Sequence, residues 1–174
     1  MTGYGFNQGI RRKVFISYHH KNDQRYCDEF RQLFAGMYNI LTDNSLQRAL
    51  NSDNAAYIDR AVRENYIHGS SITVVLCGAE TYKRKFVDWE IYATLLYDHA
   101  LLGIVLPTCE RDWTTAPYLP KLPARLRDNV NSGYAHLISY TTNPQQITVE
   151  IEKAITMKRS SLINNKRSQM SRNL

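Results

Sequence analysis

Short apolar runs alternate with amphipathic stretches along most of the chain. An apolar run of about four to eight residues is typical of a buried strand, whereas apolar residues spaced three and four apart are typical of a helix. The predicted strands cover residues 13–19, 38–43, 71–78, 101–107 and 134–140, and the predicted helices cover 21–38, 51–71, 86–99 and 143–159. Such alternation builds a parallel sheet with helices on both faces. We expect a three-layer α/β domain of the flavodoxin-like kind, with a five-stranded, mainly parallel sheet.

Several residues indicate where these elements begin, end or lie buried. Asn22 or Asp23 can cap the first helix, because a short side-chain oxygen accepts from the free amides of the first turn. Gly69 is a suitable stop for the second helix. The segment SITVVLCG (71–78) holds an unbroken apolar run, which predicts a strand covered on both faces. We expect the centre of the sheet to bury Phe15, Ile16, Val74, Val75, Ile104 and Val105.

The alternation lapses in two segments of the second half. Residues 108–133 contain three prolines and many charges, and we predict a long irregular excursion there. Residues 158–174 hold five basic residues and no acid, and they account for five of the six net positive charges. The rest of the chain is nearly neutral, so we expect a solvated, fraying end and no nucleic-acid partner. The predicted organisation is an N-terminal extension (1–12), one domain (13–157) and a basic polar tail (158–174).

Composition narrows the class of protein. A chain of 174 residues with 43% hydrophobic and 22% charged residues fits one folded, soluble domain. The three cysteines share no short spacing, which indicates reduced thiols with neither a zinc site nor a disulfide framework. No secretion signal and no apolar run long enough to span a bilayer is present. We expect a cytoplasmic protein with no metal and no membrane contact.

The familiar chemical motifs are missing. No glycine-rich phosphate loop follows any predicted strand. His19 and His20 are adjacent and would face opposite sides of a strand, so they do not predict a metal site. Ser17 has no acid placed to orient a histidine and no nucleophile-elbow glycines, which argues against a serine hydrolase.

Polar residues that follow the strands remain as candidates for a ligand site. In this architecture ligands bind beyond the carboxyl ends of the strands. The candidates for substrate binding are Phe15, Ser17, Tyr18 and His19 from the first strand, Asp43 and Asn44 after the second, and Tyr82 and Arg84 after the third. Glu90, between Trp89 and Ile91, is the candidate catalytic residue. Helical spacing alone favours a solvent-facing Glu90, and a buried carboxylate costs several kcal/mol unless it is paired.

Two segments resemble the signatures of TIR domains. KVFISYH (13–19) is similar to the first signature, a strand that ends in aliphatic, serine and aromatic residues. AETYKRKFVDWE (79–90) is similar to the third, where Tyr82 matches the family tyrosine and Glu90 the family glutamate. Ala79 and Lys85 replace the two serines of that signature, and Phe86 and Val87 replace its tryptophan and cysteine.

The resemblance covers about residues 13–106 and is strongest to the bacterial TIR-like proteins of the Thoeris antiphage system. The second TIR signature, an Arg-Asp-x-x-Pro-Gly loop, is absent, and LTDNSLQRALNSD (41–53) stands in its place. That loop serves family members in self-association and in covering the substrate. Its absence leaves closure over a substrate to other segments, such as the excursion at 108–133.

The resemblance implies an enzyme that cleaves the nicotinamide–ribose bond of NAD+. Glu90 would stabilise the positive charge that develops on the ribose, and NAD+ would be the substrate, with no separate cofactor. Attack by a hydroxyl of the same molecule would give a cyclic ADP-ribose isomer, a signal for a separate effector in antiphage defence. Two alternatives stay open: a non-catalytic TIR-like interaction or scaffold module that self-associates, and a nucleoside N-glycosyl transferase or hydrolase.

Overall fold

The computed structural model describes residues 12–42, 69–114 and 117–174. Its strands are β1 (Lys13–Ser17), β2 (Asn39–Thr42), β3 (Ile72–Cys77), β4 (Ala100–Val105) and β5 (His136–Ser139). Its α-helices are α1 (His20–Phe34), α4 (Lys85–Leu96), α5 (Ala124–Asn131) and α6 (Pro144–Met157). Two short 3-10 helices, η2 (Thr81–Lys83) and η3 (Ser160–Leu162), complete the described elements.

The five strands form one sheet in the order β2-β1-β3-β4-β5, and every neighbouring pair is parallel. The segment predicted to be central is central, because β3 pairs with both β1 and β4 and all its residues are buried. Five of the six residues expected in the centre of the sheet are at most 1% exposed, and Val105 is half-buried at the end of β4. The predicted α/β fold with a five-stranded parallel sheet is confirmed.

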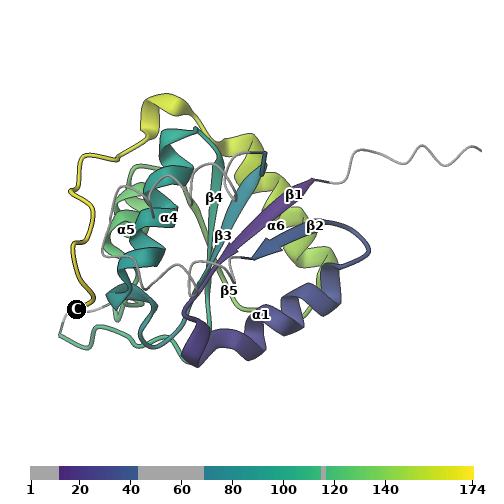
Figure 1. Cartoon of the computed structure of the whole chain (residues 1–174), viewed down its shortest axis with the longest axis horizontal. Helices are drawn as coiled ribbons and strands as arrows, with labels where there is room; N and C mark the ends of the chain where they lie inside the picture. Colours follow the sequence, from purple (N-terminus) through teal and green to yellow (C-terminus); the bar gives the residue numbers. More distant parts are fainter. Residues whose placement is uncertain (1–11, 43–68, 115–116) are drawn as a thin grey trace, which may run out of the picture.

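Helices cover both faces of the sheet (Figure 1). Alternate residues of a strand point to opposite faces. Val14 and Ile16 of β1 pack in one apolar cluster with α1 and α6, whereas Phe15 packs with Trp89 of α4. The face that carries Phe15 is covered by α4 and α5, and α5 approaches closely because β4 has a glycine there: a Cβ on Gly103 would lie 2.7 Å from a Leu137 methyl and 3.0 Å from one of Leu126.

A side-chain cap is present at the start of α6 but absent at the start of α1. Asn143 caps α6, since its side chain accepts from the amides of Gln145 and Gln146, and Pro144 suits the first helical position. The prediction that Asn22 or Asp23 caps α1 is wrong. The helix begins at His20, His19 holds the cap position without a side-chain bond, and the Asp23 carboxylate turns towards η2 instead.

The structure corrects both interpretations of the second half. The excursion at 108–133 is not irregular throughout, because it contains α5. The buried residues of that short helix are Arg125, Leu126 and Asn129, and its apolar side consists of Leu126 and Val130 alone. Residues 158–174, here called the C-terminal strap, do not fray. Leu162 and Ile163 pack on the core, and the rest of the strap follows the outside of α4 and α5 towards the C-terminus (Figure 1, yellow).

Two further expectations can be placed only in part. Most of the predicted helix at 51–71 lies outside the described residues, although Gly69 does have a left-handed backbone, with φ of +92°. Within the part of the chain that is described, no helix combines the length and the apolarity that a membrane crossing requires.

Candidate functional site

Glu90 lies on the side of α4 that packs against the sheet. Its side chain is only 5% exposed, so the interpretation of a solvent-facing residue is wrong. One turn further along the same side, the Thr94 hydroxyl lies 2.7 Å from the hydroxyl of Thr73 on β3 and donates to the carbonyl of Glu90. Because α4 runs back along the sheet between parallel β3 and β4, Glu90 lies one turn nearer than Thr94 to the carboxyl ends of the strands.

Ser17 faces the same layer from β1. It is paired with Val75 in the sheet, and Val75 packs with Val87 and Ile91 of α4, so the Ser17 side chain also points to α4. Its hydroxyl oxygen is buried and has no hydrogen-bond partner among the described residues. An unsatisfied buried hydroxyl costs about 1–3 kcal/mol. The sheet therefore carries an unused polar group in the layer that also holds Glu90.

His19 follows β1 and Arg84 follows β3, and the two side chains lie close enough to interact electrostatically. Burial lowers the pKa of His19, and the positive charge of Arg84 lowers it further, so the imidazole is neutral at pH 7. The Nδ1 atom of His19 and the Nε atom of Arg84 are both buried without a hydrogen-bond partner in the described part of the chain. Arg84 is held by Glu80, which accepts from its guanidinium at 2.6 Å.

Tyr82 lies beside this pair, on η2. The ammonium groups of Lys83 and Lys121 approach its ring, at 5.4 Å and 5.7 Å from the ring centroid. Both distances are within the range of a cation–π contact. Lys121 comes from the segment between β4 and α5, so part of the predicted excursion lies next to a predicted site residue.

The two aromatic residues of the first strand pack as core. Phe15 is fully buried in the cluster that contains Trp89 and Ala93. Tyr18 belongs to the opposite layer, where its hydroxyl donates to Gln24. Neither ring presents a face beside Glu90 on which a ligand could stack. Asp43 and Asn44, the other predicted substrate-binding residues, lie outside the described residues.

Sequence analysis overlooked the role of Asp23 at this end of the sheet. The carboxylate is fully buried and accepts from the Thr81 hydroxyl at 3.0 Å, which ties the start of α1 to η2. Burial raises its pKa. A Cβ on Gly78 would lie 2.1 Å from one of its oxygens, so this contact requires glycine after β3. An aspartate in the first turn of a helix is commonly a cap, and that pattern concealed the longer-range contact.

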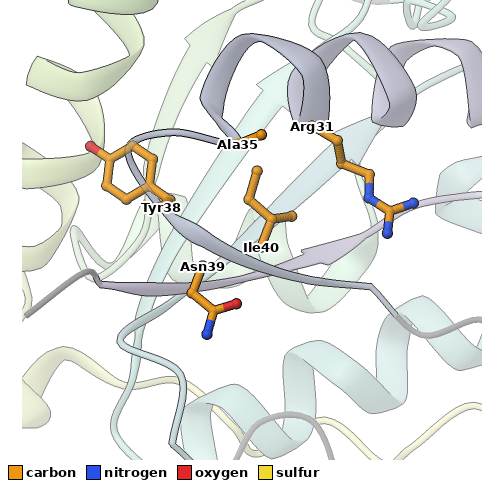
Figure 2. Close-up of a pocket in the computed structure, with 5 residues that line it drawn as sticks. All are labelled: Arg31, Ala35, Tyr38, Asn39 and Ile40. Carbon is orange, nitrogen blue, oxygen red and sulfur yellow. The ribbon is translucent and has the colours of Figure 1, made fainter.

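Two pockets lie away from these residues. One, of about 420 Å³, lies between the end of α1 and the start of β2, where Figure 2 shows Ile40 beside Ala35 and Arg31. This is the amino end of the strands, opposite to the end where ligands of such folds bind. The other, of about 760 Å³, is lined by Arg25, Tyr26, Asp28, Glu29, Gln32, Pro107 and Tyr140. Among the described residues, no group of three or more His, Cys, Asp and Glu is arranged to hold a metal ion.

Comparison with known proteins identifies the family. A search among curated proteins finds no match to the sequence. Residues 15–111 match the family described as Thoeris protein ThsB, TIR-like domain. The match covers more than half of the chain, including β1 from Phe15 onwards, β3 and the whole of α4 with Glu90. The protein therefore belongs to the Thoeris ThsB family of TIR-like domains.

Proposed function

We propose that this protein cleaves the bond between nicotinamide and ribose in NAD+ and joins the remaining ADP-ribose into a cyclic isomer. In this proposal the product is a diffusible signal that activates a separate effector in Thoeris antiphage defence. NAD+ is the substrate, and no further cofactor takes part. The family to which the chain belongs supports the setting of this proposal, and the placement of Glu90 supports the chemistry.

The observation that carries the proposal is a carboxylate kept almost fully from solvent in the layer between α4 and the sheet. A carboxylate in such a place is costly, and protein cores seldom contain one without a use. A solvated residue on the outer side of α4 does not fit an exposed fraction of 5%.

Glu90 has two tasks in the proposed reaction. As the nicotinamide–ribose bond lengthens, the ribose gains oxocarbenium character, and a fixed negative charge stabilises that transition state more than it stabilises the substrate. The same carboxylate accepts a hydrogen bond from a ribose hydroxyl and so fixes the ring. Nicotinamide leaves as a neutral molecule from a cationic ring, so the reaction requires no strong general acid.

The other residues of the site bind and orient the substrate. Arg84 supplies positive charge for the diphosphate of NAD+, assisted by Lys83 and Lys121 around Tyr82. His19 is neutral at pH 7 and can donate or accept one hydrogen bond without adding charge. The buried Ser17 hydroxyl is a further hydrogen-bonding group in the layer of Glu90.

The test compares wild type with Glu90→Gln and with Glu152→Gln. Both substitutions remove one carboxylate, but Glu152 is exposed on α6, on the opposite face of the sheet, where it pairs with Arg12. Each protein is produced beside its cognate effector, the cells are challenged with phage, and the lysates are assayed for nicotinamide and a cyclic ADP-ribose isomer. Purified protein with NAD+ is assayed in parallel.

We expect Glu90→Gln to lower nicotinamide release by about 10²–10³-fold, because it removes one well-placed electrostatic group. KM should change far less than kcat. Glu152→Gln should match wild type. A folded Glu90→Gln protein that yields wild-type levels of product would refute the assignment of Glu90. A wild-type protein that releases no nicotinamide in challenged lysates would refute the proposed reaction and favour the interaction module.

A further inference from the structure

The C-terminal strap follows α4 from its last turn to its first. Just beyond the last turn, Asp98 accepts from the hydroxyl of Ser160 and interacts with the ammonium group of Lys158, 3.4 Å away. In the middle, the Asn165 amide donates to the carbonyl of Tyr92 at 3.2 Å. The strap and α4 therefore run antiparallel, and the end of the strap reaches the part of α4 that precedes Glu90.

The strap supplies hydrogen-bond partners to the first turn of α4. The residue at its cap position, Arg84, makes no side-chain capping bond. Instead, the Asn173 side chain accepts from the amide of Lys85 at 2.9 Å, and the amide of Leu174 donates to the carbonyl of Lys83 at 3.0 Å. The free amides at a helix start need such acceptors. A residue about ninety positions away in sequence thus supplies the cap.

Met170 fixes the next two residues of α4. Its amide donates to the Asp88 carboxylate at 2.9 Å, and its carbonyl accepts from the indole of Trp89 at 2.8 Å. The strap backbone is therefore hydrogen-bonded to the two residues that directly precede Glu90. The ring of Trp89 in turn packs with Phe15 of β1, so these hydrogen bonds also influence how α4 packs on the sheet.

Arg125 of α5 locks the strap against Asp88. Its guanidinium, which is fully buried, donates to both oxygens of Asp88, at 2.9 Å and 3.2 Å. Its remaining donors go to the strap: the side chain of Asn165 and the carbonyls of Arg167 and Ser168, at 2.7–3.0 Å. All five donors of the guanidinium are used, which gives the strap one defined path.

We propose that the C-terminal strap positions Glu90 for catalysis, with Asn173 and Met170 as positioning residues that do not touch the substrate. The proposal rests on the proposed function. The strap caps the first turn of α4, holds Asp88 and Trp89, and so determines where the Glu90 carboxylate lies relative to Ser17 and the strand ends. A displacement of a catalytic group by about 1 Å can cost up to about 10²-fold in rate, so a strap far from the chemistry can control kcat.

The test uses point variants in the full chain, because loss of the whole strap would leave the buried Arg125 without three acceptors. Asn173 is exposed, so Asn173→Ala removes the cap of α4 without opening a cavity. Trp89→Phe keeps an aromatic ring but loses the bond to Met170. Asn173→Asp is the conservative variant, since a carboxylate also caps a helix start. Lys166→Ala is the matched control: it is an exposed strap residue whose side chain makes no hydrogen bond or ion pair among the described residues.

We expect the Trp89→Phe/Asn173→Ala double variant to lower kcat about tenfold with KM changed less than about threefold. Asn173→Asp in the Trp89→Phe background should recover much of that loss, and Lys166→Ala should match wild type. Hydrogen exchange gives the second readout. Amides of Lys85–Trp89 should exchange about tenfold faster in the double variant, whereas amides of β3 should keep their wild-type rates.

The outcomes separate this inference from the proposed function. Faster exchange in α4 with an unchanged kcat would overturn the inference and leave the proposed function standing, since the strap would then only stabilise. Unchanged exchange in the double variant would also overturn it, because the strap would not hold the first turn. A wild-type protein that releases no nicotinamide would overturn the proposed function and, with it, the catalytic role of the strap.

Discussion

The two helical layers on either face of the sheet differ in the kind of residues that they bury. Between the sheet and α1 and α6, the buried contacts are almost all apolar, made by residues such as Phe30, Phe34 and Ile151; among the described residues, Asp23 at the start of α1 is the charged exception. On the side of α4 and α5, many polar and charged groups are buried. Ser17, Thr73, Glu90 and Thr94 lie between the sheet and α4, whereas Asp88, Arg125 and Asn129 lie where α4 and α5 meet the strap.

The layer of α1 and α6 has the composition expected when only stability is required, whereas the layer of α4 and α5 does not. Apolar packing supplies most of the stability of a small domain, and the layer of α1 and α6 follows that rule. Buried polar groups add cost unless each one is paired. In the layer of α4 and α5, Arg125 is fully paired with Asp88 and the strap, whereas the Ser17 hydroxyl has no partner among the described residues. The paired groups fix the geometry, and we interpret the unpaired one as part of the site.

The largest expected effect on stability comes from breaking the buried ion pair. Arg125→Ala leaves the Asp88 carboxylate, 3% exposed, without its charged partner. Removing one member of such a pair costs about 3–5 kcal/mol. The control is Arg127→Ala on the same helix, where the arginine is exposed. Denaturant unfolding should show a large loss for the first variant and little change for the second. Equal losses would mean that helix propensity, and not the buried pair, is responsible.

A cavity in the apolar layer should affect stability but not turnover. Ile151 is fully buried in the cluster of α1 and α6, and Ile151→Ala should cost about 3 kcal/mol. Because this layer lies on the opposite face of the sheet from α4, kcat of the folded protein at low temperature should stay within about twofold of wild type. Unfolding curves measure the loss of stability, and initial rates on the same preparations measure kcat. A kcat that falls as far as the stability would show that the two layers are coupled.

The architecture could be predicted from sequence because the signals that encode it are local and apolar. The run ITVVLCG becomes central β3, and Ile147, Ile151 and Ala154 form the buried stripe of α6. The same method placed Glu90 at the correct end of the sheet. Spacing alone favoured a solvent-facing Glu90, and its burial, with the contact between Thr94 and Thr73 one turn along, corrects that interpretation.

The parts that were missed depend on contacts distant in sequence. α5 is only eight residues long and most of its buried residues are polar, so its one apolar pair, Leu126 and Val130, was too short a pattern to predict it. The strap docks through backbone carbonyls that Arg125 binds, and no periodicity in KRSSLINNKRSQMSRNL records this. Tyr18 was assigned to the site as an aromatic residue at the end of the first strand, yet successive residues at a strand end point to opposite layers. Five basic residues suggested a solvated tail; one of them, Arg167, instead pairs with Asp128 of α5.

A smaller effect is expected from the threonine pair that seats α4 on β3. Thr94→Val leaves the buried Thr73 hydroxyl without its partner, 2.7 Å away in wild type, and should cost about 1–3 kcal/mol. The double variant Thr73→Val/Thr94→Val removes both hydroxyls and should recover much of the loss. Thr156→Val, at an exposed threonine of α6, is the control. If the double variant is no more stable than Thr94→Val, packing and not hydrogen bonding dominates this contact.

The smallest expected effect is a pH dependence from His19. Its pKa in the folded protein is below the ordinary value of 6.5, because burial and then the charge of Arg84 disfavour the imidazolium. Between the folded pKa and about 6.5 the unfolded chain therefore binds a proton that the native protein does not, and stability falls as pH is lowered through this window. His19→Gln should lose less stability than wild type between pH 7.5 and about 5.5. Arg84→Gln should raise the pKa of His19 and narrow the window. NMR titration of the imidazole measures that pKa directly. A value at or above 6.5 would mean that water reaches His19 freely, and that the end of the sheet beside Glu90 is not the desolvated site that the proposed chemistry requires.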